Sequence, residues 1–372
     1  MKLIESSIYL EALQRVHFRL EEASKANVEV FGQPWYTKHF AYGTTPHMMK
    51  DFKTILGKMH LTIAASTIDS HAAEPLRLNQ GFESIAQSMF THAHAYKLEA
   101  DELREMIYLL RGNEMAPEAA VNYVTDKLWD FVAQAVKGVH ARLDIITQTA
   151  LSNEGKFTFT KQNDPQSPFI GQTLDFGLPN GNKFYASSGA IWNEANLNTI
   201  DPVKDIDDMC KASRVGFEKI LTDKSIVNYM CRTKAMKDYI NSTLYPNKPL
   251  TQTALNNWLS ENGYPTFEIV ESKVNVQDGN QVHELTPWKS GQLIFIPKNQ
   301  IGTIETQYSD AEIGLKDKNV DYSYYGRIEV ARMEQGESQN TNYAEIIKAR
   351  LTGAPSIDTI DDIMTFDTTK NA

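Results

Sequence analysis

Two histidines, His92 and His94, come nearest to a metal-binding pattern in this sequence. They stand two positions apart in FTHAHAYK, and on a β-strand that spacing directs both side chains to one face, a geometry that can bind zinc. No nearby Cys, Asp or Glu completes a ligand set, and the segment is predicted to lie in an exposed ribbon. We therefore expect structural or surface histidines and no metal site.

A cluster of three carboxylates, Asp205, Asp207 and Asp208, could coordinate a cation. The same segment carries the signals of a helix start, because Asp201 is a good N-cap and Pro202 fits the first helical position. Carboxylates in the first turn of a helix complement its dipole. We expect these three to stabilise the helix and not to bind a metal.

The other reactive side chains point away from catalysis. The two cysteines, Cys210 and Cys231, fall in segments predicted to be helical and rich in Met, so two buried thiols in a reducing compartment are favoured over a disulfide. The chain has no Walker loop, no dinucleotide fingerprint, no G-x-S-x-G and no H-E-x-x-H. Catalytic residues can be scattered, but these absences favour a binding or structural role. We expect no catalytic residue and no cofactor.

Composition limits the class of protein further. The 372 residues are 41% hydrophobic and 10% aromatic, which predicts a folded chain of two domains or one elaborated domain. A net charge of -10 argues against tight sequence-specific binding of nucleic acid, but not against a protein that encloses nucleic acid without gripping it. No run approaches the ~20 apolar residues of a membrane span, and Glu5 and Glu11 interrupt any signal-peptide core.

Helical periodicity gives the clearest elements. From Pro117 to about Leu151, apolar residues recur in steps of three and four, which predicts an amphipathic helix. Its ~35 residues at ~1.5 Å each give a rod of roughly 50 Å, whose single apolar face must lie along a sheet or another helix. Shorter helices are predicted over residues 3–24, 201–220, 223–240 and 251–265, the last of them ending at Gly263.

Two segments are predicted to have little core of their own. The aromatic stretch VEVFGQPWYTKHFAYGTTPHMMKDF, broken by Gly and Pro, predicts an extended arm. Residues 59–98 predict a long two-stranded ribbon, which is marginal in water unless its own chain or a neighbouring copy supports it. Arg77, near the ribbon tip, either belongs to a solvated loop or pairs through its planar fork with a carboxylate of an adjacent subunit.

Strands dominate the second half of the chain. In PWKSGQLIFIP, four consecutive apolar residues, Leu293 to Ile296, predict a strand that is buried on both faces. TFEIVESKVNV precedes it and ends in a hairpin turn at Asp278, Gly279 and Asn280. PNGNKFY is expected to form a hairpin-like turn, and SIDTIDDIMTFDT one last strand. Helices and strands interleave irregularly, so the predicted class is α+β.

The stretch around PWKSGQLIFIP resembles the major capsid protein E family of tailed phages, the lambda-type branch of the HK97-like fold. Trp288, the apolar strand ending at Pro297 and the following Gly302 carry this resemblance, together with the lead-in LSENGYPTFEIVESKVNVQDG. The segment YGRIEVARMEQGESQNTNYAEIIKARLTGAPSIDTIDDIMTF is similar to the way the family ends. The order of N-terminal arm, extended ribbon, long helix and mixed domain also fits the family.

The resemblance implies an α+β, HK97-like capsid fold in which the apolar strand is central to the apical domain and the ribbon lies over a neighbouring copy. The implied parts are an N-terminal helix and extended arm (1–58), an extended loop (59–103), a peripheral domain (104–195 and 330–372) with a spine helix at about 117–151, and an apical domain (196–329).

The implied function is that of the major capsid protein of a tailed double-stranded DNA phage. Such a protein assembles in the host cytoplasm as hexamers and pentamers into the icosahedral head and resides in the virion. The implied partners are other copies of the chain, portal, scaffold and decoration proteins, and packaged DNA held without sequence specificity, with no membrane. The alternative is a soluble α+β enzyme or ligand-binding protein with a scattered site, for which the ribbon at 59–98 would need a lid or pocket role.

Overall fold

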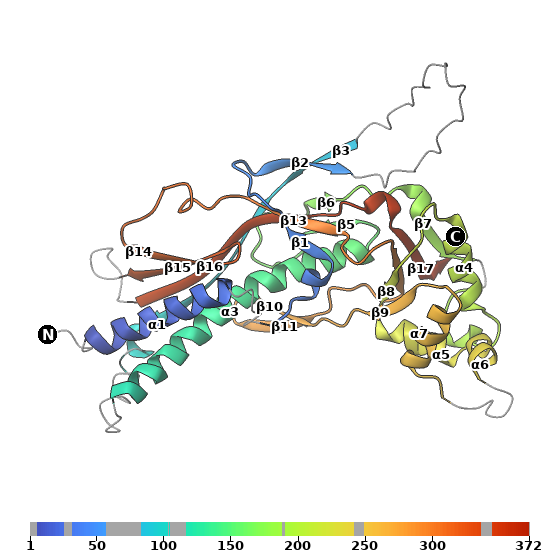
Figure 1. The fold of residues 1–372 in the computed structure, drawn as a ribbon, viewed down its shortest axis with the longest axis horizontal. Helices are drawn as coiled ribbons and strands as arrows, with labels where there is room; N and C mark the ends of the chain where they lie inside the picture. The colour runs from blue at the N-terminus through green and yellow to red at the C-terminus, as the bar shows by residue number, and fades with distance from the viewer. Residues whose placement is uncertain are drawn as a thin grey trace, which may run out of the picture.

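A long central helix and two sheets organise the molecule (Figure 1). The computed structural model describes residues 6–25, 32–56, 83–102, 104, 117–187, 190–241, 249–335 and 344–371. A six-stranded sheet packs along the central helix, α3, and a five-stranded sheet lies towards the helix's C-terminal end (Figure 1). Among the described residues, no helix combines the length and the hydropathy that a membrane span requires.

Helix α3 (Pro117–Ser152) confirms the predicted spine helix over its 36 residues. Its apolar stripe is buried, with Leu128, Val136 and Leu143 all 0% exposed. Helix α1 (Ser6–Lys25), predicted at residues 3–24, lies alongside α3 and buries small and medium side chains against it. On each helix the apolar residues recur in steps of three and four, and the stripe they form packs against a partner surface.

The six-stranded sheet is built around the 13-residue strand β16. Strands β4 and β15 pair with β16 on either side, and β13 continues on the β15 side. All of its pairings are antiparallel except the one between β1 and β13. Its strands are β1 (Phe40–Tyr42), β13 (Gly302–Thr306), β16 (Ala344–Ser356), β15 (Ile328–Gln335), β14 (Val320–Tyr325) and β4 (Phe90–Glu99).

Strand β4 corrects the predicted ribbon. It pairs with β16 over its whole length, so residues 90–98 of the segment at 59–98 are part of the main sheet and not an exposed excursion. The two-stranded ribbon among the described residues consists of β2 (Asp51–Leu56) and β3 (Glu83–Ser88). The alternation that was visible around Met89–Ala95 in the sequence marked a strand with one buried face, supported by its own chain.

The five-stranded sheet holds the strand predicted to be buried on both faces. This strand, β12, is the middle one, and all five of its residues are buried, which confirms the prediction. The order is β7 (Lys183–Ala186), β17 (Met364–Asn371), β12 (Gln292–Ile296), β8 (Lys219–Thr222) and β9 (Thr266–Ile269). A second apolar core joins this sheet to α4 (Pro202–Ala212), α5 (Lys224–Arg232), α6 (Lys234–Ile240) and α7 (Gln252–Glu261).

Three local predictions were wrong. The helix expected at 201–220 ends at Ala212, and residues 219 and 220 belong to β8. The single helix expected at 223–240 is two helices, because Thr233 has an extended backbone, donates its N–H to Met230 and accepts one from Met236 through its hydroxyl. PNGNKFY forms no hairpin: a 3₁₀ turn (Asn180–Asn182) leads into β7, which pairs in parallel with β17. Gly263 follows α7 with φ of +78°, as the helix-end signal predicted.

Short elements complete the described chain. The turn predicted at Asp278–Asn280 is confirmed by the hairpin of β10 and β11, in which Gly279 has φ of +58°. The remaining strands and turns are β5 (Lys156–Thr158), β6 (Thr173–Asp175), β10 (Val274–Asp278), β11 (Gln281–Leu285), η1 (Trp35–Lys38), η3 (Glu194–Asn196) and η5 (Ile360–Asp362).

The strands cross the predicted domain ranges. Strands β13 and β14, from the range 196–329, lie in the six-stranded sheet with β15 and β16. Strand β17, from the range 330–372, lies beside β12, and β7, from the range 104–195, pairs with the other edge of β17. The two cores therefore draw on alternating stretches of the chain, and the predicted ranges stay a prediction as domain limits.

Candidate functional site

The paired histidines of β4 face α3 and hold no metal-ligand set. His92 is 7% exposed, and burial lowers its pKa to about 3. His94 packs against Gly138, where a side chain on α3 would collide with the imidazole. With Arg142 and Asp164 the two histidines line a cleft of about 320 Å³. No group of three or more His, Cys, Asp or Glu within the described ranges is arranged to hold a metal ion.

The acidic cluster lies on α4, but only Asp205 is in the first turn; Asp207 and Asp208 lie further along the helix than predicted. Asp201 caps the helix and accepts from the N–H of Val203 at 3.1 Å. Asp205 accepts from the indole N–H of Trp192 at 2.9 Å, and Asp207 pairs with Lys211 one turn further on. These contacts give the carboxylates a structural role.

The remaining predicted residues have mixed outcomes. Both cysteines are free thiols; Cys231 is buried, whereas Cys210 is only partly so. Arg77, the candidate intersubunit contact, lies outside the described residues, as does the rest of 57–82.

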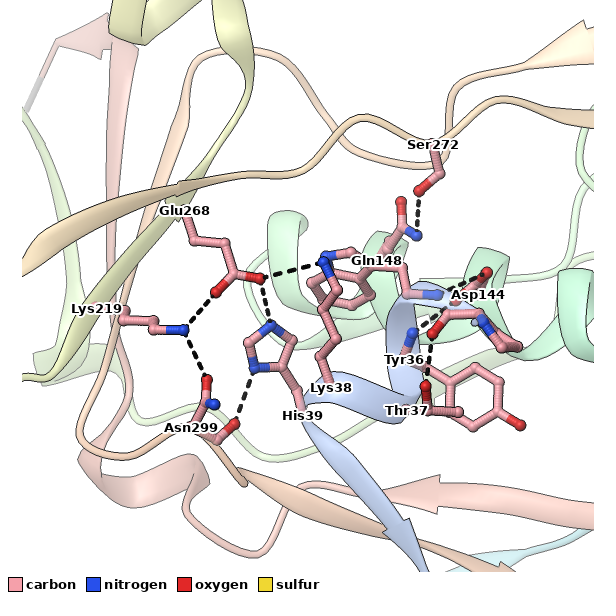
Figure 2. Close-up of polar contacts among 12 residues, drawn as sticks. Tyr36, Thr37, Lys38, His39, Asp144, Gln148, Lys219, Glu268, Ser272 and Asn299 are labelled. Carbon is pink, nitrogen blue, oxygen red and sulfur yellow. Dashed lines mark hydrogen bonds and ion pairs between the residues drawn. The ribbon is translucent and has the colours of Figure 1, made fainter. Parts of the chain in front are cut away.

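The polar residues that the structure does bring together lie where the N-terminal arm meets α3 and the five-stranded sheet (Figure 2). We call this cluster the arm joint: residues Trp35–His39 with Asp144, Lys219, Glu268 and Asn299. Trp35 and Tyr36 of the arm are both buried in the main core, as is Phe40 of β1. The arm therefore supplies core side chains, and the prediction that it has little core of its own was wrong.

Helix α3 holds the arm by its backbone. The carboxylate of Asp144 accepts from the N–H of Tyr36 at 2.8 Å and from that of Trp35 at 3.3 Å. Burial raises the pKa of Asp144 to about 6, although the two backbone hydrogen bonds act in the opposite direction. The phenol of Tyr36 contacts Nδ1 of His140 at 2.7 Å, and burial lowers the pKa of His140 to about 4.

The sheet holds the arm through a carboxylate on β9. Oε1 of Glu268 lies 3.2 Å from Nε2 of His39, and Oε2 accepts from Nζ of Lys219 at 2.8 Å. Hydrogen bonds from His39 and Lys219 hold the pKa of Glu268 at about 2, against the effect of burial. Nδ1 of His39 lies 2.8 Å from the carbonyl oxygen of Asn299, and the side chain of His39 is fully buried. Lys38 adds a longer contact of 4.0 Å to the same carboxylate.

The contacts of the arm joint are those of a structural site. The charged groups around Glu268 contact one another, whereas Nε1 of Trp35 is buried without a hydrogen-bond partner among the described residues. The joint ties three distant parts of the chain into one body, which is a structural role. Sequence reasoning missed it because Asp144, Lys219 and Glu268 are far apart in the chain and form no local motif. The one available signal was the run of aromatics in WYTKHFAY, which is costly to leave exposed.

Comparison with known proteins fixes the fold. No family model and no curated protein matches the sequence. A solved chain from a prophage of E. coli CFT073, provisionally described as a capsid protein, superposes with a TM-score of 0.56 at 10% identity, covering 94% of this chain and 98% of that one. The chain has the HK97-like capsid fold.

Two further solved structures match over most of this chain. A phage-related protein from Bordetella bronchiseptica RB50 has a TM-score of 0.48 at 9% identity, covering 94% of this chain and 96% of that one. The capsid of the myovirus XM1 has a TM-score of 0.45 at 14% identity, covering 90% and 91%. The superposition on the prophage chain confirms the HK97-like α+β fold predicted from the sequence, while membership of the protein E branch within it stays a prediction.

Proposed function

We propose that this chain is the major capsid protein of a tailed double-stranded DNA phage, a structural protein and not an enzyme. It assembles as hexamers and pentamers into the icosahedral head that encloses the genome. The observation that supports this most strongly is the HK97-like fold over nearly the whole chain, because the match covers 94% of it and leaves no room for a large unrelated catalytic domain.

The parts of the fold take roles in this proposal. Helix α3 is the spine of the peripheral domain, together with the six-stranded sheet. In this proposal the apical domain consists of α4–α7 and the five-stranded sheet, in which β7 and β17 also lie. The ribbon of β2 and β3 is the base of the extended loop, which lies over a neighbouring copy in the shell.

Exposed apolar side chains at the foot of this ribbon support a contact between copies. Met48 is 65% exposed and Met49 is 74% exposed, and only Lys50 separates them from β2. Two adjacent, flexible thioethers in water are unusual unless another surface covers them. We assign them to the interface with the neighbouring copy.

Arg77 is proposed as a second contact between the extended loop and the adjacent subunit, where it pairs with a carboxylate. Arg77→Ala should then lower particle yield and the thermal stability of assembled shells, while the circular dichroism of the unassembled chain is unchanged. Arg104→Ala, an exposed arginine near the end of β4, serves as the control. Unchanged particles would return Arg77 to a solvated loop, and loss of the chain's own fold would place the ribbon within its own subunit.

The wider setting follows from the shell role. The proposed location is the virion, after assembly in the host cytoplasm. The proposed partners are further copies, portal, scaffold and decoration proteins, and DNA on the inner face. A net charge of -10 suits that last contact, since a shell must not hold its genome so tightly that packaging or release stalls.

Assembly tests the proposal directly. The chain is expressed with and without a scaffold protein, and the products are examined by size-exclusion chromatography and negative-stain electron microscopy. Closed shells or capsomer rings are expected. A chain that stays monomeric at high concentration under both conditions would contradict the capsid role and favour the alternative of a soluble binding protein or enzyme.

A further inference from the structure

The arm joint contains a histidine whose two ring nitrogens both face acceptors. Nδ1 of His39 lies 2.8 Å from the carbonyl oxygen of Asn299, and Nε2 lies 3.2 Å from Oε1 of Glu268. A carbonyl oxygen accepts only, and so does an ionised carboxylate. A neutral imidazole has one N–H and can satisfy one of these partners, whereas an imidazolium satisfies both.

Burial makes this difference matter. The side chain of His39 is 0% exposed, so bulk water does not reach the ring. A neutral ring would hold a nitrogen lone pair against an oxygen lone pair in this enclosed site, and an unmade hydrogen bond there carries its full desolvation penalty. We propose that His39 is held as an imidazolium and that loss of its proton releases the N-terminal arm from the five-stranded sheet.

The charged groups around the ring fit this assignment. Glu268 on β9 is the anion that touches it, and that carboxylate also receives Lys219 from β8 at 2.8 Å and Lys38 of the arm at 4.0 Å. On the α3 side, Asp144 faces the arm's backbone N–H groups. The indole of Trp35 packs against the ring at 4.9 Å between centroids.

Among cationic side chains, the imidazolium is the kind whose charge changes nearest to neutrality. Ammonium groups in water keep their protons well above the range of about pH 5 to 8 in which imidazoles change charge. The docked arm holds the proton that a released arm would give up to water. Docking is therefore strongest at the acid end of this range and weakens as pH rises through it.

Hydrogen exchange at the joint measures this coupling. The N–H groups of Ile301 and Gly302 donate to the carbonyl oxygen of His39 at 2.8 and 3.3 Å, so they report arm docking. Their exchange in the unassembled chain, corrected for the intrinsic effect of pH, should accelerate by about 10-fold to 100-fold between pH 5.5 and pH 8.5. That range is typical of the loss of one buried charge-assisted hydrogen bond.

Two variants separate the proposed effect of His39 protonation on arm docking from a general effect of pH. His39→Gln should exchange rapidly at every pH with no slope, because an amide does not change charge. Glu268→Gln should also remove the slope while keeping the arm docked, because its amide can donate to a neutral ring. His17→Gln, at an exposed site on α1, is the control and should keep the wild-type slope. A flat wild-type profile, or an equal slope in His39→Gln, would overturn the proposal.

The neighbouring carboxyl of Asp144 is tested separately, because its pKa of about 6 lies in the same range. Asp144→Asn should retain the slope above pH 6.5 if His39 is its source; loss of that part of the slope would overturn the proposal. NMR of the ring nitrogens in ¹⁵N-histidine-labelled wild-type chain gives the protonation state of His39 directly, without any substitution. Two ring N–H groups on His39 at pH 5.5 are expected, and a singly protonated ring at that pH would refute the assignment.

Discussion

Replacing Asp144 by Asn should change how the stability of the chain depends on pH. A pKa of about 6 in the fold, against 3.8 for the free side chain, corresponds to about 3 kcal/mol at about 1.4 kcal/mol per factor of ten in proton affinity. Between these two values the folded chain holds a proton that the unfolded chain has released. The free energy of unfolding of the wild type therefore carries a component that falls as pH rises from about 4 to about 6 and is constant above about 7.

Asp144→Asn removes this component, because the amide does not ionise. At pH 4 the variant is less stable than the wild type, since one of the two arm N–H groups bound by Asp144 loses its acceptor, at about 1–3 kcal/mol. Relative to the wild type, its free energy of unfolding should then rise by roughly 2–3 kcal/mol between pH 4 and pH 7.5.

Urea denaturation at four pH values, followed by tryptophan fluorescence in dilute unassembled chain, measures the difference. Asp126→Asn, at an exposed position of the same helix, controls for the loss of a carboxylate and should give a curve parallel to that of the wild type. If the curve of Asp144→Asn also ran parallel to the wild type within about 0.5 kcal/mol, Asp144 would not be a buried anchor of the arm, and the geometry described for the joint would be wrong.

Three other substitutions test other parts of the fold. Val139 of α3 is 1% exposed, so Val139→Asp buries an unpaired charge. This costs several kcal/mol of a total folding stability of ~5–15 kcal/mol, and soluble expression should be lost. Normal shells from this variant would mean that this face of α3 is not core. Gly302→Ala brings a methyl group into the backbone of Ser356 and the ring of Phe40, and should lower the melting temperature by the equivalent of ~1–3 kcal/mol; an unchanged melting curve would show that β1 does not pack this closely. Met48→Asp should leave the circular dichroism of the unassembled chain unchanged while reducing particle yield in electron micrographs, and full yield would exclude Met48 from the interface.

Periodicity predicted the elements that depend on their own residues. The stripe on α3 and the apolar run of β12 each require one kind of environment, and the structure supplies it in both cases. Caps were predictable for the same reason, since Asp201 and Gly263 act within one turn of their own position. The break between α5 and α6 was missed, because it depends on Thr233, whose hydroxyl caps α6.

The joint could not be predicted, because its energetics depend on pairs that only the fold brings together. His39 meets Glu268 across 229 positions of sequence, and Tyr36 meets Asp144 across 108. In the sequence, each of these residues has the pattern of an ordinary polar side chain on the surface. The placement of β4 failed in a related way: its alternation showed that one face is buried, but not which strand covers its edge.

The position of β16 in the chain has a consequence for synthesis. This strand is the shared partner of β4, β13 and β15, and β17 likewise lies between β7 and β12. Neither sheet is complete until its C-terminal strand has emerged from the ribosome, so the pairings of β16 and β17 form after translation of the greater part of the chain. Such late, long-range closure slows folding and leaves strand edges open for longer. Under the proposed capsid role, a nascent chain would present a finished subunit surface only after β17 has been made.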